Sequence, residues 1–158
     1  MFMKKFILLL YTCAVLTSCA DKPFVIIQIA DAQLGFDAAV KGQSPDAEYV
    51  NDLTYETEFL KQAVQKVNAL KADAVVFTGD QVNKPEDALQ WDTFADAISE
   101  IDSQTSVFHI PGNHDVLLSE GKVDITPFSS RYGEDRFVYS DNKVCIVGIN
   151  SNLIKSND

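Results

Sequence analysis

Positive charge is scarce in this chain of 158 residues. Thirteen lysines and arginines stand against 23 aspartates and glutamates, which gives a formal net charge of −10 at pH 7. A nucleic-acid partner is therefore not expected, because binding to phosphate backbones depends on Lys and Arg. The acidic balance is compatible with a site that gathers cations and, equally, with an ordinary solvated surface.

Cysteine is scarce as well, with only Cys13, Cys19 and Cys145. Cys13 and Cys19 fall in and directly after an N-terminal apolar run, so no disulfide framework is available. Cys145 lies in the apolar stretch KVCIVGI, which predicts a buried strand. We expect Cys145 to be a small core residue rather than a nucleophile, because apolar surroundings raise the pKa of a thiol.

Long hydrophobic runs are missing too. The apolar stretch FILLLYTCAVL has eleven residues, whereas a helix that spans a bilayer needs about 20. It follows the basic start MFMKK, and this order predicts an export signal over residues 1–18 rather than a buried N-terminal strand or helix. LTSC, at residues 16–19, resembles the lipobox of bacterial lipoproteins. That resemblance implies a lipid on Cys19, a mature chain of residues 19–158 and anchoring to the bacterial cell envelope, either periplasmic or at the cell surface.

The rest of the chain predicts a single α/β domain. Apolar runs at residues 22–30, 74–78 and 105–110 predict buried strands, and amphipathic patterns at residues 55–73 and 84–102 predict helices. The second helix has Pro85 and Glu86 in its expected first turn. Strands that alternate with helices indicate a mostly parallel β-sheet with flanking helices.

Three further segments are assigned from local patterns. Residues 36–52 predict a loop, and Thr126 and Pro127 predict a short helix that ends at Gly133. The stretches RFVYS and KVCIVGIN predict a hairpin around a two-residue turn at Asp141 and Asn142.

Histidine is the scarcest reactive residue. The only two, His109 and His114, both lie in the stretch HIPGNHDV. His109 falls on the third predicted strand, where we expect a packed or hydrogen-bonded side chain. His114 follows that strand, among residues that suit a reactive site.

Polar residues follow each of the three predicted strands. They are Asp31 and Gln33 after the first, Asp80 and Asn83 after the second, and Asn113, His114 and Asp115 after the third. One Asp after a strand is usually a turn residue. The carboxyl ends of parallel strands meet at one edge of the sheet, so three such groups indicate a ligand site there. Carboxylate and amide oxygens suit Mg, Ca or Mn, whereas imidazole draws Zn, Fe or Ni.

The motifs DAQ, GDQVN and PGNHD, in this order, resemble those of the calcineurin-like metallophosphoesterase superfamily over about residues 24–154. The resemblance implies an α/β/β/α sandwich, of which residues 19–158 would form the first half. It also implies hydrolysis of a phosphate mono- or diester, with no side-chain nucleophile, at two divalent metal ions (Mn, Fe, Zn or Mg). The expected ligands are Asp31, Gln33, Asp80 and Asn113.

The same resemblance implies the catalytic residues His114, Asn83 and Asp115. His114 would contact the phosphate and protonate the leaving oxygen. Asn83 would accept a hydrogen bond from His114 through its side-chain carbonyl, without the charge of the Asp that many members have there. Asp115 completes the third motif.

Two departures from the superfamily leave alternatives open. Gln33 replaces the usual histidine and resembles a branch with Asp-Pro-Gln; Glu56 or Glu58 could supply the missing oxygen, although a solvated helix residue is the simpler expectation. No histidine follows His114, so we expect a fragment truncated at its C-terminus or a degenerate member. The alternative functions are a catalytically inactive metal- or phosphate-binding lipoprotein on the same fold and a plain acidic α/β domain.

Overall fold

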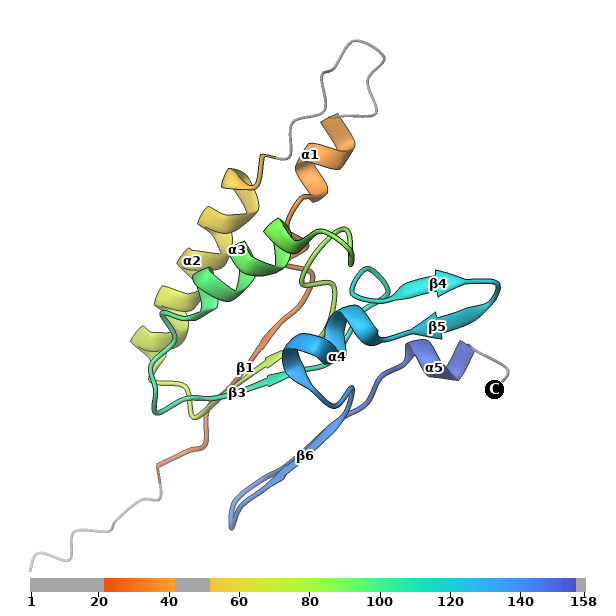
Figure 1. The fold of residues 1–158 in the computed structure, drawn as a ribbon. Coiled ribbons are helices and arrows are strands. Elements are labelled where there is room, and N and C mark those ends of the chain that lie inside the picture. The colour runs from red at the N-terminus through yellow and green to blue at the C-terminus, as the bar shows by residue number, and fades with distance from the viewer. Residues whose placement is uncertain (1–21, 42–51, 156–158) are drawn as a thin grey trace, which may run out of the picture.

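The structure is a computed structural model that describes residues 22–41 and 52–155 (Figure 1). The predicted export signal, Cys19 and part of the predicted loop over residues 36–52 lie outside these ranges. Within them, no helix is both long enough and apolar enough to cross a membrane.

The centre of the fold is a three-stranded parallel sheet, which confirms the predicted fold class. Its strands, in the order β1 (Ile26–Ile29), β2 (Ala74–Phe77) and β3 (Ser106–His109), are in register, so that Ile29, Phe77 and His109 lie side by side. The segments that leave these three strands therefore begin at the same edge of the sheet. All four residues of β2 are buried, as its continuous apolar sequence predicts.

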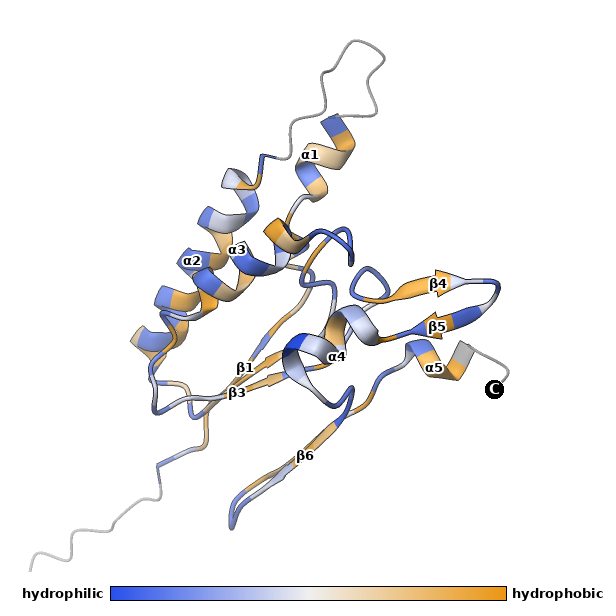
Figure 2. Ribbon diagram, viewed as in Figure 1, coloured by the Kyte–Doolittle hydropathy of each residue, from blue (hydrophilic) through white to orange (hydrophobic). Residues whose placement is uncertain are grey.

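Two helices, α2 (Thr54–Leu70) and α3 (Ala88–Ile98), run side by side over one face of the sheet (Figure 1). Hydrophobic and hydrophilic residues alternate along both (Figure 2). The hydrophobic side of α2 buries Leu60, Val64 and Val67. Across the interface, the ring of Phe94 on α3 meets Phe77 of β2 edge-on, with 5.2 Å between ring centroids.

Helix α3 begins later than its sequence pattern predicts. Asp87 is its N-cap, and its side chain accepts hydrogen bonds from the backbone N–H groups of Leu89 and Gln90. Pro85 and Glu86 therefore precede the helix, and the expectation that they form its first turn is wrong. A proline is merely tolerated in the first turn of a helix, whereas a side chain that accepts from two free N–H groups stabilises the start of the helix directly. The start is therefore set by the Asp87 cap.

The remaining elements include some that the sequence did not predict. Helix α1 (Phe36–Lys41) lies in the predicted loop, and α5 (Asn152–Lys155) follows the last strand. The hairpin of β4 (Leu117–Ser119) and β5 (Lys122–Asp124) turns at Glu120 and Gly121, which have positive φ angles of 50° and 78°. Helix α4 (Thr126–Tyr132) is confirmed, with Gly133 as its C-cap.

The predicted hairpin is present as β6 (Phe137–Ser140) and β7 (Cys145–Gly148). Its connection has four residues instead of two, because the Asp141 carboxylate accepts hydrogen bonds from the backbone N–H groups of Lys143 and Val144. Cys145 is exposed, so its prediction as a core residue is wrong. In the two-stranded hairpin, the face of β7 that carries Cys145 is exposed to solvent. An apolar run in the sequence does not reveal this exposure.

Candidate metal centre

The segments after β1 and β2 run together beyond the sheet. The backbone N–H of Asp31 donates to the carbonyl of Gly79 at 3.2 Å, and that of Gln33 donates to the carbonyl of Asp80 at 2.8 Å. A parallel bridge between Leu34 and Val82 continues the pairing. The first two motifs are therefore held in a fixed register.

Three residues at these strand ends have left-handed backbones. The φ angles are 55° at Asp31, 42° at Gln33 and 51° at Asp80. Each such conformation costs a non-glycine residue roughly 1–3 kcal/mol and persists only where the surrounding structure enforces it. Strain of this kind, repeated at two carboxylates of one sheet edge, is typical of a functional site.

The third motif packs closely on the second. The backbone N–H of His114 donates to Oδ1 of Asp80 at 2.9 Å. A Cβ atom added to Gly112 would overlap this carboxylate, and one added to Gly79 would lie 2.6 Å from the Cα of Gly112. Glycine at both positions therefore allows the contact between the two loops.

A polar cavity of about 270 Å³ opens at this edge, and three of the predicted ligands line it: Asp31, Asp80 and Asn113. One donor comes from the end of each parallel strand, as the sequence predicts for this sheet. Ser151 and Asn152, which follow β7, also line the cavity. We call this space the polar cavity.

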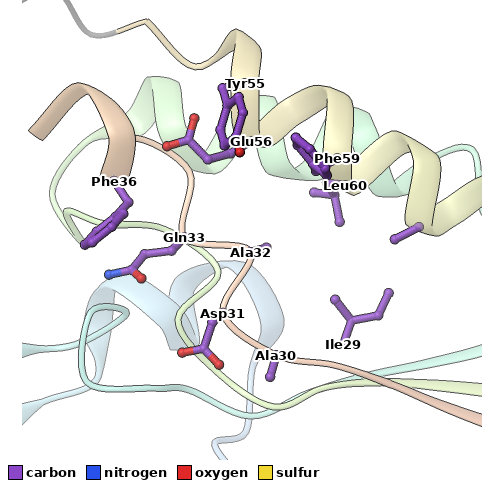
Figure 3. Close-up of a pocket in the computed structure, with 11 residues that line it drawn as sticks. Ile29, Ala30, Asp31, Ala32, Gln33, Phe36, Tyr55, Glu56, Phe59 and Leu60 are labelled. Atoms are coloured by element: carbon purple, nitrogen blue, oxygen red, sulfur yellow. The ribbon is translucent and has the colours of Figure 1, made fainter. Parts of the chain in front are cut away.

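Gln33, the fourth predicted ligand, does not line the polar cavity. Its Nε2 lies 3.4 Å from Oδ1 of Asn83, and its side chain faces a neighbouring pocket that Glu56 also lines (Figure 3). Glu56 is buried, so the expectation that it is solvated is wrong, and Glu58 is exposed as expected.

The donor set fits a divalent cation that prefers oxygen. In the part of the chain that the structure describes, no three His, Cys, Asp or Glu side chains are grouped so that they could hold a metal ion. The polar cavity offers two carboxylates and an amide oxygen, a set that suits Mg or Mn better than a metal that seeks nitrogen or sulfur.

His114 is oriented by the backbone of Asn83 and not by its side chain. Nδ1 of His114 lies 3.0 Å from the Asn83 carbonyl oxygen. A carbonyl oxygen only accepts, so Nδ1 carries the proton and Nε2 is left for another partner. The prediction that the Asn83 side chain performs this task is wrong, since residue spacing does not distinguish a side-chain oxygen from a main-chain one.

Asp115 is fully buried between the second and third motifs. Its carboxylate accepts four hydrogen bonds, from the backbone N–H groups of Gln81, Val82 and Gly112 and from Nε2 of Gln81. Burial raises the pKa of Asp115 to about 6, and the backbone hydrogen bonds oppose this rise. A side chain with no exposed surface does not reach a substrate, so Asp115 positions the two loops and the expectation that it is catalytic is not supported.

Asn152 is a site residue that the sequence prediction omitted. Its Nδ2 donates to the carbonyls of Pro111 and Gly112, at 3.3 and 3.1 Å. It thereby braces the loop that carries Asn113. The only sequence signal was its place in the stretch GINSN, just after the last predicted strand.

His109 is packed as expected. Its ring stacks on Tyr132, with 3.9 Å between centroids, and on Phe77, at 5.0 Å. Burial lowers the pKa of His109 to about 4. The neutral ring is therefore part of the core and does not face the polar cavity.

A family model for the calcineurin-like phosphoesterases matches residues 24–155, nearly all of the described chain. The chain belongs to this family. The match spans all three strand-end motifs.

One solved structure gives the same picture of the fold. A purple acid phosphatase from seeds of yellow lupin (Lupinus luteus) superposes with a TM-score of 0.50 at 17% identity, over 73% of this chain and 22% of its own. A dimetal phosphatase from Danio rerio gives a TM-score of 0.39 at 23% identity, over 58% and 30% of the two chains. This chain thus spans less than a third of the length of either protein. None of the curated protein sequences matches it.

Proposed function

We propose that the protein hydrolyses a phosphate mono- or diester with the help of divalent metal held at the polar cavity. The observation that supports this proposal is the convergence of Asp31, Asp80 and Asn113 on one cavity. His114 does not line this cavity, but its backbone N–H donates to Oδ1 of Asp80. Membership of the calcineurin-like phosphoesterases supports the same reaction class.

Each residue has a task that follows from its chemistry. The carboxylates of Asp31 and Asp80 would hold the cation, and Asn113 would add a neutral oxygen. When bound, such an ion lowers the pKa of a water molecule toward neutrality and offsets the charge of the phosphoryl oxygens. These three donors are fewer than the six oxygens of an octahedral ion, so water and the substrate would complete the set.

His114 would act on the leaving oxygen. Its Nδ1 proton is held by the Asn83 carbonyl, so a proton for the leaving oxygen would have to come from Nε2. In the imidazolium form, Nε2 also carries a proton and can deliver it to the departing alcohol. Asp115 would keep the loops of Asp80 and His114 in place through its four hydrogen bonds.

The test combines metal binding with turnover in the protein as its own cell makes it. Titration calorimetry with Mn²⁺ should give saturable binding. Asp80→Asn should weaken it at least about 100-fold, and Asp92→Asn, an exposed control on α3, should leave it unchanged. Turnover of 4-nitrophenyl phosphate should require the metal and should fall on His114→Ala. Turnover that is independent of both the metal and His114 would contradict the proposal.

One observation favours a second candidate, a non-catalytic protein that binds metal or phosphate. Only two carboxylates line the polar cavity, and the described residues supply no cluster of three acidic, histidine or cysteine ligands. That protein would bind Mn²⁺ with the same dependence on Asp80 but would turn over no phosphate ester.

We also propose that the mature protein is a lipoprotein anchored through Cys19. The support is the sequence order of MFMKK, an apolar stretch and LTSC. Mass spectrometry of the native protein should show a chain that begins at Cys19 and carries acyl groups, and Cys19→Ala should abolish that species. An unacylated native protein that retains residues 1–18 would exclude the anchor.

A further inference from the structure

A second pocket, which we call the side pocket, adjoins the polar cavity. It lies between the end of β1 and helices α1 and α2 and has a volume of about 350 Å³ (Figure 3). Asp31 lines both spaces, so the side pocket begins at a candidate metal ligand. A group attached to a phosphate in the polar cavity could therefore extend into it.

Three aromatic side chains surround the side pocket. Phe36 comes from α1, and Tyr55 and Phe59 come from α2 (Figure 3). They are 49%, 60% and 56% exposed, although Leu60, beside them on the inner side of α2, is only 4% exposed. The rings of Tyr55 and Phe59 pack against each other, with 4.8 Å between centroids. Large apolar surfaces that gather around a pocket are typical of a ligand site.

The side pocket also contains a carboxylate whose hydrogen bonding is incomplete. Glu56 is 9% exposed, and its Oε1 accepts a hydrogen bond from the backbone N–H of Asp37 at 2.7 Å. Its Oε2 is buried and has no hydrogen-bond partner among the residues that the structure describes. A buried acceptor left without a donor is unfavourable, so a ligand that brings an N–H group to Glu56 would gain affinity.

We propose that the side pocket binds the leaving group of the phosphate ester, and that this group is a planar ring that carries an N–H donor. The aromatic side chains would pack on the ring, and Glu56 would accept its N–H. The inference rests on the proposed function, since it places the phosphoryl group in the polar cavity. In hydrolysis, a water oxygen would form a new bond to phosphorus as the P–O bond to the leaving group breaks. The leaving oxygen would take up a proton, which gives inorganic phosphate and a phenol or alcohol.

The experiment compares three substrates in the native protein: methyl phosphate, phenyl phosphate and 3-aminophenyl phosphate. Phe59→Ala should lower the ratio of kcat/KM for phenyl phosphate to that for methyl phosphate about tenfold, because it removes a ring contact. Glu56→Gln keeps an acceptor for Asp37 but replaces the other oxygen by a donor. It should lower the ratio for 3-aminophenyl over phenyl phosphate about tenfold.

Matched controls lie on the same helix. Leu70→Ala removes an exposed apolar side chain at the far end of α2, and Glu58→Gln neutralises an exposed glutamate; neither residue lines the side pocket. Both ratios should stay at the wild-type value in these controls. The proposal is overturned if Phe59→Ala leaves the ratio for phenyl over methyl phosphate unchanged. It is also overturned if Glu56→Gln leaves the ratio for 3-aminophenyl over phenyl phosphate unchanged.

A binding measurement separates this proposal from the proposed function. If the wild-type protein hydrolyses none of the three esters, the proposed function fails, and the side pocket is then tested with 3-aminophenol, the leaving group itself. Ligand-observed NMR should show binding that Phe59→Ala and Glu56→Gln weaken about tenfold. Absence of binding, or equal binding by the variants and their controls, would overturn the proposal.

Discussion

Oδ1 of Asp80 accepts a hydrogen bond from the backbone N–H of His114 at 2.9 Å, across 34 residues of sequence. This contact joins the second strand-end motif to the third. It also fixes the position of the Asp80 carboxylate, a residue that lines the polar cavity. A proposed metal ligand and a proposed general acid are thus positioned by one bond.

Asp80→Asn should separate the structural task of this carboxylate from its binding task. The amide oxygen can still accept from His114, but the charge is lost. We expect the affinity for Mn²⁺ to fall at least 100-fold, more than the 10–100-fold typical of residues that only support a ligand. Titration calorimetry measures this, with circular dichroism to verify the fold. A wild-type affinity in the folded variant would exclude Asp80 as a ligand.

The contact between His114 and the main chain of Asn83 predicts unequal effects at the two positions. His114→Ala should lower kcat about 10²–10⁴-fold, the contribution of a general acid. Asn83→Ala keeps the carbonyl that accepts from Nδ1 and should lower kcat less than tenfold. Steady-state turnover of an aryl phosphate measures both losses of kcat. If the Asn83 side chain oriented the His114 ring instead, Asn83→Ala and His114→Ala should lower kcat by comparable factors.

Asn152 should matter for metal binding more than for stability. Asn152→Ala removes both hydrogen bonds to the loop that carries Asn113. We expect the affinity for Mn²⁺ to fall about 10–100-fold, as for other supporting residues of metal sites. Asn142→Ala, in the exposed hairpin connection, is the control. Equal affinities in the two variants would contradict a positioning role for Asn152.

His109 should make the protein less stable in acid. Its pKa is about 4 in the folded chain against 6.5 for the ordinary value, because its ring is buried between Phe77 and Tyr132. Between these two pH values the unfolded state binds more protons, so the free energy of unfolding falls as the pH falls from about 6.5 to about 4. The loss is on the order of 3 kcal/mol at 1.36 kcal/mol per pKa unit.

His109→Phe keeps an aromatic ring in the stack but cannot bind a proton. Urea unfolding at pH 7 and pH 4.5 should show a smaller loss of stability for this variant than for the wild type. The control is His114→Phe, which replaces the other histidine, because His114 is only partly buried. Its loss of stability between pH 7 and pH 4.5 is compared with that of His109→Phe. An equal acid loss in wild type and His109→Phe would show that His109 does not cause it.

The sequence was sufficient for the sheet and for the polar residues that gather at its edge. Continuous apolar runs of strand length, separated by amphipathic helices, determine a parallel sheet, and the residues after each strand must then share one edge. Asp31, Asp80 and Asn113 could be chosen on that basis because it depends only on order along the chain. The buried place of His109 also followed from its position on a strand.

Contacts between distant segments were decided by the tertiary structure alone. Whether His114 meets the side chain or the carbonyl of Asn83, whether Asp115 is buried, and which space Gln33 faces all depend on backbone angles such as the left-handed φ of Asp31 and Asp80. Asn152 reaches the site only because the segment after β7 returns to the Pro111–Gly112 loop. These relations arise from packing in three dimensions, whereas periodicity and motif spacing report only local structure.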